Sequence, residues 1–239
     1  MLIKLLFFVT SKKEAIIFIR VKICCISSIE EAKLAIKYGA SALGLVSEMP
    51  SGPGVIDDEL IAEIVCKVPP PIATFLLTSK QNADDILLQH SKTLTNTLQL
   101  VDHLPQSELI KLKKKLPEVK LVQVIHVIDE ESVSEALNVE KFVDALLLDS
   151  GNPKLKVKEL GGTGRTHNWE ISRSIIESVN IPVFLAGGLN IENVDNAINT
   201  VQPFGLDLCS GVRTNGMLDE EKLKAFMKKV QDFNLKNSE

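Results

Sequence analysis

ALLLDS, at residues 145–150, is the stretch on which the fold assignment depends. Four consecutive apolar residues predict a strand buried on both faces, as in a parallel sheet covered by helices. The strand ends at Asp149, and a glycine-rich segment follows it at residues 161–164. Catalytic groups of α/β barrels lie at the C-terminal ends of strands, so Asp149 is a candidate catalytic residue. The plain alternative is an Asp that starts a turn or caps a helix.

The same succession of apolar strand, loop and helix recurs along the whole chain. We expect strands at 21–25, 42–46, 72–77, 97–101, 119–127, 143–149, 181–185 and 204–208. We expect a first helix capped by Ser27 or Ser28 and ended by Gly39, and later helices at 57–67, 82–89, 105–116, 130–137, 168–179, 191–200 and 219–233. Each unit has about 26 residues, enough for a parallel crossover. Eight such units predict a single (β/α)8 TIM barrel. A doubly wound sheet is the alternative, but its glycine fingerprint is absent after the first strand.

Chain length fits one barrel domain, since such domains commonly have about 250 residues and this chain has 239. We assign residues 21–233 to the barrel and 234–239 to a C-terminal tail. Residues 1–20 are predicted to be an extension, either a non-native start or a cover for the closed end of the barrel. Their apolar run is interrupted by Lys4, is too short to span a bilayer and is a poor signal peptide.

Composition narrows the possible partners. A formal net charge of −4 argues against nonspecific binding to nucleic acid or membranes, which favour basic surfaces. Only 5% of the residues are aromatic, so no stacking platform for single strands is expected. The four cysteines form neither a disulfide framework nor a paired metal-binding pattern. We therefore expect a cytoplasmic protein in a reducing compartment, without a metal.

The predicted strand ends supply the candidate site residues. In chain order they are Cys24, Ser47, Thr78, Val101 with Asp102, His126, Asp149, Gly187 with Gly188, and Ser210 with Gly211. Alternation of side chains puts Lys22 and Cys24 on the inner face and points Cys25 outward. A buried Lys22 needs a partner, and Asp207 on the eighth strand is the candidate once the barrel closes. Cys24 could also be a small filler of the core.

Histidines give a weaker signal. His126 is expected to be a pocket-wall residue or a strand-end histidine with satisfied hydrogen bonds. His167 lies in a glycine-rich loop, where a substrate contact and ordinary loop placement are both open. His90 and His103 are predicted to be surface residues.

Glycine pairs after the last two strands point to a phosphate site. LAGGL at 185–189 and CSGV at 209–212 occupy the positions where barrels bind phosphate through backbone N–H groups. Tight turns are the alternative for each pair alone. The sixth loop adds further N–H donors, and Arg165 in it could add charge. We expect a phosphorylated small-molecule substrate, bound by Gly162, Gly164, Gly187, Gly188, Ser210 and Gly211.

Several of these segments resemble one family in order and spacing. VKICCI at 21–26 resembles the VKICGI opening of phosphoribosylanthranilate isomerases of tryptophan biosynthesis. LLLDS at 146–150, GTGRTHNW at 162–169, LAGGL at 185–189 and DLCSGV at 207–212 are similar to its later motifs, and the resemblance covers residues 21–232. It implies an aldose–ketose isomerase, an intramolecular oxidoreductase, which carries out an Amadori rearrangement without a cofactor. We expect the protein to be a monomer or homodimer.

The resemblance also implies roles for two residues. Asp149 would be the general acid that protonates the ribose ring oxygen, and Cys24 the general base that removes the C2′ proton. Burial at an apolar strand end can raise the pKa of such an acid, and nearby positive charge favours a thiolate. Lys22 and Asp207 would support the site.

The chain departs from the family at four places. Cys25 stands where the family has glycine, and PSGPG at 50–54 lacks the arginine that holds the anthranilate carboxylate. QLVD at 99–102 replaces a Gln-Leu-His-Gly segment, and Asn168 replaces an aspartate before Trp169. A divergent paralogue with another phosphosugar ligand, even a noncatalytic one, is therefore an alternative. An aldolase is a further one, but no strand-end lysine is placed for its Schiff base.

Overall fold

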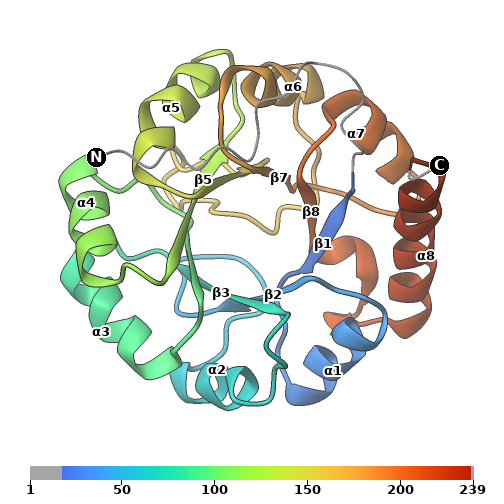
Figure 1. Ribbon diagram of the computed structural model, residues 1–239, viewed down its shortest axis with the longest axis horizontal. Helices are drawn as coiled ribbons and strands as arrows, with labels where there is room; N and C mark the ends of the chain where they lie inside the picture. Colours follow the sequence, from blue (N-terminus) through green and yellow to red (C-terminus); the bar gives the residue numbers. More distant parts are fainter. Residues whose placement is uncertain (1–17, 238–239) are drawn as a thin grey trace, which may run out of the picture.

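Eight parallel strands close into a barrel, and helices form a ring around it (Figure 1). The computed structural model of the protein describes residues 18–237. The barrel strands are β1 (Arg20–Ile23), β2 (Ala42–Val46), β3 (Ala73–Thr78), β4 (Thr97–Leu100), β5 (Lys120–His126), β6 (Ala145–Asp149), β7 (Val183–Leu185) and β8 (Gly205–Leu208). Because β1 pairs with both β2 and β8, the predicted (β/α)8 barrel is confirmed and the doubly wound alternative is wrong.

A helix follows each barrel strand. The helices are α1 (Ile29–Lys37), α2 (Asp58–Val65), α3 (Ala83–Thr93), α4 (Gln106–Lys115), α5 (Glu131–Val139), α6 (Trp169–Ser178), α7 (Val194–Val201) and α8 (Glu220–Lys236). Short 3₁₀ turns, η1 (Glu140–Phe142) and η2 (Ser210–Val212), and a hairpin of β9 (Arg213–Thr214) and β10 (Met217–Leu218) complete the described chain. No helix of residues 18–237 is long and apolar enough to cross a membrane.

The helix starts follow from side-chain caps. Five helices begin after a residue whose side-chain oxygen accepts a backbone N–H of the first turn, which satisfies a donor that the helix leaves free. These residues are Ser28, Asp57, Asn82, Asn168 and Asp219. Most elements end within a few residues of the predicted bounds; α3 runs four residues longer, to a left-handed Leu94.

The two ends of the chain differ in part from the predicted division. Most of the predicted extension, residues 1–17, lies outside the described residues. Ile19 is 2% exposed and β1 begins at Arg20, so the barrel takes up residues that we assigned to the extension. At the other end α8 continues to Lys236, into the predicted tail.

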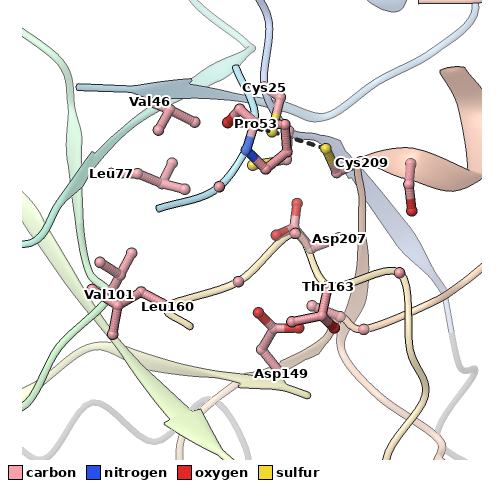
Figure 2. A pocket seen from close by; sticks show the side chains of 18 of the residues that line it. Cys25, Val46, Pro53, Leu77, Val101, Asp149, Leu160, Thr163, Asp207 and Cys209 are labelled. Atoms are coloured by element: carbon pink, nitrogen blue, oxygen red, sulfur yellow. Dashed lines mark hydrogen bonds between the residues drawn. The ribbon is translucent and has the colours of Figure 1, made fainter. Parts of the chain in front are cut away.

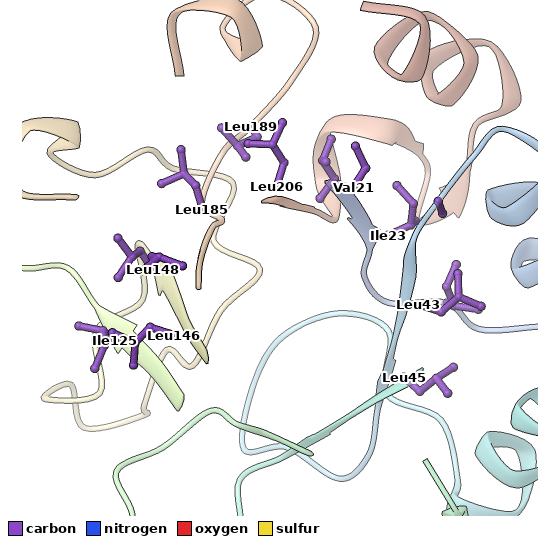
Figure 3. Packing of buried hydrophobic residues seen from close by; sticks show 14 of the residues in the cluster. Val21, Ile23, Leu43, Leu45, Ile125, Leu146, Leu148, Leu185, Leu189 and Leu206 are labelled. Atoms are coloured by element: carbon purple, nitrogen blue, oxygen red, sulfur yellow. The ribbon is translucent and has the colours of Figure 1, made fainter. Parts of the chain in front are cut away.

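Alternation along the strands builds two apolar layers. Leu43 and Leu45 of β2 face the surrounding helices together with Val21 and Ile23 of β1 (Figure 3). Residues of the opposite parity, such as Val46, pack inside the barrel in a separate cluster. The strands therefore read as continuous apolar runs because both faces are buried. The inner cluster lies directly beneath the polar residues at the C-terminal ends of the strands.

A buried ion pair joins the first strand to the last inside the barrel. Lys22 is paired in register with Asp207, and its Nζ lies 2.8 Å from an Asp207 carboxylate oxygen, so the predicted pair is present. Burial disfavours the ammonium, but attraction to Asp207 outweighs it and raises the pKa of Lys22. Gly44 leaves room for this lysine, since a Cβ there would lie 2.8 Å from Lys22 Nζ and 2.9 Å from Cys24 Sγ.

We expect Lys22→Met and Asp207→Leu each to lower the free energy of unfolding by about 3–5 kcal/mol, because each leaves a buried charge unpaired. The double variant should lose far less than the sum. Urea denaturation of the four proteins measures the coupling. Lys37→Met is the matched control, since Lys37 makes a pair of the same 2.8 Å length with Glu220 at the surface and should change little. Additive losses in the buried pair would contradict this account.

Candidate active site

A cavity opens at the end of the barrel where the strands finish, and two chemically different walls enclose it (Figure 2). Val46, Leu77, Val101 and Leu160 form an apolar wall on the side of β2, β3 and β4. The opposite wall carries carboxylates, thiols and the glycine-rich loops after β6, β7 and β8. Such a cavity suits a ligand with one aromatic or aliphatic part and one anionic part.

Asp149 stands at the C-terminal end of β6 and points into the cavity (Figure 2). Its side chain is buried, and one carboxylate oxygen accepts a hydrogen bond from the backbone N–H of Ser150 at 2.8 Å. Desolvation raises the pKa of Asp149, and this effect outweighs the hydrogen bond and the nearby positive charges, which lower the pKa. A raised pKa favours the protonated carboxyl group, the form that can donate a proton to a ligand.

Cys24 follows directly after β1 and also lines the cavity. Its backbone N–H donates to the Leu208 carbonyl at 2.7 Å, which continues the pairing of β1 with β8. The ammonium group of Lys22 lies on the same side of β1, next to the Cys24 thiol above Gly44. The cavity thus holds a thiol and a carboxyl group from strands on different sides of the barrel.

Cys25 does not point outward as strand alternation predicts. Its φ is +62°, so the extended conformation stops at Cys24 and the next side chain turns back toward the cavity, which it lines. The Cys25 thiol lies 3.6 Å from the Pro53 carbonyl oxygen and 2.9 Å from the sulfur of Cys209. A non-glycine residue in this left-handed region is uncommon and strained. The family glycine at this place would adopt the conformation freely.

A buried ion pair outside the predicted set holds this turn in place. Arg213 donates to the carbonyl oxygens of Cys24 at 3.2 Å and Cys25 at 2.6 Å, and it pairs with Glu31 at 2.9 Å. Glu31 also accepts the backbone N–H groups of Ser27 and Leu218. Burial tends to raise the pKa of Glu31, but these hydrogen bonds lower it overall. Sequence reasoning missed both residues, because Glu31 resembles an ordinary first-turn glutamate.

The glycine-rich loops meet at the polar wall. Gly162, Gly164, Gly187 and Gly188 line the cavity, and all four have a positive φ. A Cβ at Gly188 would lie 2.7 Å from the backbone carbon of Arg165, so the sixth and seventh loops pack closely. Left-handed residues of this kind can form concave nests of backbone N–H groups, which are suited to binding an anion.

The eighth loop contributes one of its two predicted residues to the lining. Ser210 lines the cavity and is exposed. Gly211 is not among the lining residues; a Cβ there would overlap the carbonyl oxygen of Leu189, so its role is close packing of the seventh and eighth loops.

The remaining candidates lie outside the cavity. His126 Nε2 is 2.9 Å from the Val101 carbonyl oxygen, as expected of a strand-end histidine with a backbone partner. His167 Nε2 lies 2.7 Å from Ser172 Oγ, and burial lowers the pKa of His167 to about 4. Arg165 pairs with Glu159. His90 is not a surface residue, since its ring is buried and bonds to the Thr95 carbonyl.

Comparison with known proteins gives a consistent result. The N-(5'-phosphoribosyl)anthranilate (PRA) isomerase family matches residues 21–229. The N-(5'-phosphoribosyl)anthranilate isomerase 2 of Methanosarcina mazei is 36% identical over 215 residues, which are 89% of this chain and 94% of that protein. The M. acetivorans isomerase is 35% identical over 225 residues, with 89% and 93% covered.

Solved structures agree with this result. The phosphoribosylanthranilate isomerase of Thermotoga maritima superposes with a TM-score of 0.77 at 30% identity, covering 90% of this chain and 99% of that one. A phosphoribosylanthranilate isomerase in complex with reduced 1-(o-carboxyphenylamino)-1-deoxyribulose 5-phosphate gives a TM-score of 0.75 at 28% identity, with 90% and 99% covered.

The Glu31–Arg213 pair generates a pH-dependent prediction. Glu31→Gln should lower the free energy of unfolding at neutral pH by about 3–5 kcal/mol, because it leaves the buried guanidinium unpaired. The pKa of Glu31 is lowered from 4.5, so its stabilising effect is present above pH 4.5 and is lost as the pH falls through the folded-state pKa. The gap between variant and wild type should therefore shrink in acid.

Urea denaturation from pH 3 to pH 7 measures this gap, and Glu30→Gln is the matched control. Glu30 is the exposed neighbour in the same helical turn and should give a small effect that varies little with pH. A Glu31→Gln gap that stayed constant into acid would show that the carboxylate charge does not stabilise the turn.

Proposed function

The chain belongs to the N-(5'-phosphoribosyl)anthranilate isomerase family, and on that premise we propose that Asp149 and Cys24 carry out the Amadori rearrangement of N-(5-phosphoribosyl)anthranilate in its cavity. The product is 1-(carboxyphenylamino)-1-deoxyribulose 5-phosphate, and the step belongs to tryptophan biosynthesis. The observation that carries the proposal is that a buried carboxyl group with a raised pKa and a thiol line the same cavity.

Ring opening is the first step. Protonated Asp149 donates its proton to the furanose ring oxygen, and the C1′–O bond breaks to leave a Schiff base between the sugar and the aglycone nitrogen. The apolar strand below Asp149 supports this role, since desolvation favours the uncharged acid.

Proton removal from C2′ is the second step. The Cys24 thiolate takes this proton, and the electrons of the C–H bond form an enolamine that tautomerises to the aminoketose. The ammonium group of Lys22 and the Cys24 sulfur both lie close to Gly44, on the same side of the barrel. No step needs a metal or an organic cofactor.

Phosphate recognition falls to the glycine-rich wall. We assign the phosphate to the backbone of Gly162, Gly164, Gly187 and Gly188 and to Ser210, which all line the cavity. Gly211 supports this site through the packing of its loop rather than through the lining. Backbone N–H groups are suitable donors here because they carry no charge that desolvation would penalise.

The aromatic ring of the substrate fits the apolar wall. Val46, Leu77, Val101 and Leu160 offer a surface for a flat ring opposite the phosphate loops. None of the described residues that line the cavity is basic. The arginine that is missing from the second loop is therefore not replaced by a basic residue elsewhere in the lining. Lys158 stands nearby in the sixth loop, paired with Asp102, and its carbonyl accepts from Ser51 of the lining.

The same family supports a proposal for the assembly and the location of the protein. We propose that the protein works as a monomer or homodimer; monomers derived from the dimeric Thermotoga maritima isomerase share its fold at 27% identity and a TM-score of 0.74, covering 90% of this chain and 99% of that one. Its four cysteines are free, which suits the cytoplasm as a reducing compartment.

Cys24→Ser and Asp149→Asn should each lower kcat by about 10²–10⁴-fold, the usual value of one positioned acid or base. A serine hydroxyl is not ionised near neutrality, and an amide cannot donate the acid proton. Steady-state kinetics with phosphoribosylanthranilate measures the effect. Wild-type kcat should also fall as the pH rises through the raised pKa of Asp149, because the acid is then ionised.

The control separates chemistry from folding. Affinity for a reduced product analogue should remain close to wild type in both variants, and Cys66→Ser, at an exposed cysteine after α2, should keep full turnover. Full activity of both Cys24→Ser and Asp149→Asn would exclude this assignment of acid and base.

Ser210→Glu should weaken the binding of inorganic phosphate and raise KM by about 10-fold or more, since a carboxylate at the wall repels the phosphate dianion across a short distance. Ser210 is a better test position than Gly188, where any side chain would also clash with Arg165. Calorimetric titration with phosphate measures binding. Ser107→Glu on α4 adds the same charge at an exposed, distant serine and should leave affinity unchanged. Equal affinities of the two variants would place the phosphate elsewhere.

A further inference from the structure

Two thiols that the proposed reaction does not use face each other in the wall of the cavity. The sulfurs of Cys25 and Cys209 lie 2.9 Å apart, joined by a hydrogen bond that Figure 2 shows as a dashed line. Both residues line the cavity, so a small solute that enters it reaches them. The fold thus brings together two of the four thiols of the chain, from residues that are 184 positions apart in the sequence.

The backbone around these thiols fits a disulfide. β1 and β8 pair in register at Ile23 and Leu208, which places Cys209 opposite Cys24 and one residue away from Cys25. The Cα atoms of Cys25 and Cys209 are therefore separated by the strand spacing of about 4.8 Å together with an offset of one residue along the strand. Disulfides accept Cα distances of about 4.4–6.8 Å. Cys24 and Cys25 cannot compete easily, because neighbouring Cα atoms across a trans peptide are about 3.8 Å apart.

The two thiols differ in acidity. The hydrogen bond with Cys25 lowers the pKa of Cys209 against its partial burial, and the guanidinium of Arg213 adds to the effect. The same bond and burial raise the pKa of Cys25 well above its usual value. Cys209 is therefore the more readily ionised thiol of the pair, and Cys25 is the thiol that lies in position to react second.

We propose that Cys25 and Cys209 are a reversible oxidation site, at which a hydroperoxide converts the two thiols into a disulfide across the cavity wall. The Cys209 thiolate attacks the peroxide, breaks its O–O bond, and becomes a sulfenic acid while hydroxide takes up a proton as water. The Cys25 sulfur then attacks the sulfenic sulfur, and the second oxygen leaves as water with the Cys25 proton. Two thiols and one hydrogen peroxide thus give one disulfide and two water molecules.

The bond changes the geometry of both functional loops. Cys25 follows Cys24, and Cys209 precedes Ser210, so a disulfide draws the loop of the base toward the phosphate wall. The sulfurs must approach from 2.9 Å to about 2.05 Å. Displacements of this size near reacting groups can reduce turnover about 10²-fold. This consequence for turnover rests on the proposed function, whereas the formation of the disulfide does not.

Thiol counting and peptide mapping of the full chain test the site. The reduced protein is treated with one equivalent of hydrogen peroxide, alkylated and digested. Wild type should lose two of its four thiols, yield a linked pair of peptides containing Cys25 and Cys209, and regain both thiols with dithiothreitol. Cys66→Ser is the matched control at an exposed cysteine and should form the same link.

Cys209→Ser, Cys25→Ser and Cys25→Gly should form no internal disulfide; the glycine variant also suits the positive φ at this position. A link through Cys24 or Cys66, or thiol loss without a link in folded wild type, would overturn the proposal. The turnover of each oxidised protein is compared with the turnover of the same protein in its reduced state. The turnover of disulfide-linked wild type should be about 10²-fold lower. Linked protein with full turnover would refute the effect on catalysis, and reduced wild type without turnover would instead count against the proposed function.

Discussion

The contact between Lys22 and Asp207 lies where the barrel closes, and the site depends on it. It joins the first strand to the last, so it exists only when all eight strands have taken their places. Its charges are buried at the base of the cavity, where each would be costly alone. Gly44 on β2 has no side chain and so leaves the space that Lys22 needs to form this pair. The closure of the barrel, the pairing of the two buried charges and the position of the Cys24 thiol therefore depend on one another.

Above this pair the chain makes a turn that its own residues disfavour. Cys25 adopts a positive φ, and the strain is held by Arg213, which binds the carbonyl oxygens on either side of that turn and is itself neutralised by Glu31. The result is a wall in which two further thiols meet beside Cys24. A glycine would make the same turn without the strain, but it would bring no second sulfur.

The cavity divides its task between side chains and backbone. Asp149 and Cys24 present reactive groups whose behaviour depends on burial and on neighbouring charge. The glycine-rich loops present backbone instead, and their glycines adopt positive φ values. The apolar wall is made of ordinary core residues that happen to reach the strand ends. A phosphorylated aromatic glycosylamine needs these three surfaces, and the family supplies its identity.

Sequence alone determined the barrel, its eight strands and most of its site, because buried runs such as ALLLD and the alternation of side chains are local properties. Asp149, the glycine pairs and the Lys22–Asp207 pair followed from strand ends and strand parity. Only the tertiary structure decided the turn at Cys25, the packing of Gly211 against Leu189, and the Arg213–Glu31 pair between residues 182 positions apart. Periodicity cannot predict these, since contacts between loops depend on how the closed barrel brings its strand ends together and on a single backbone angle where alternation stops.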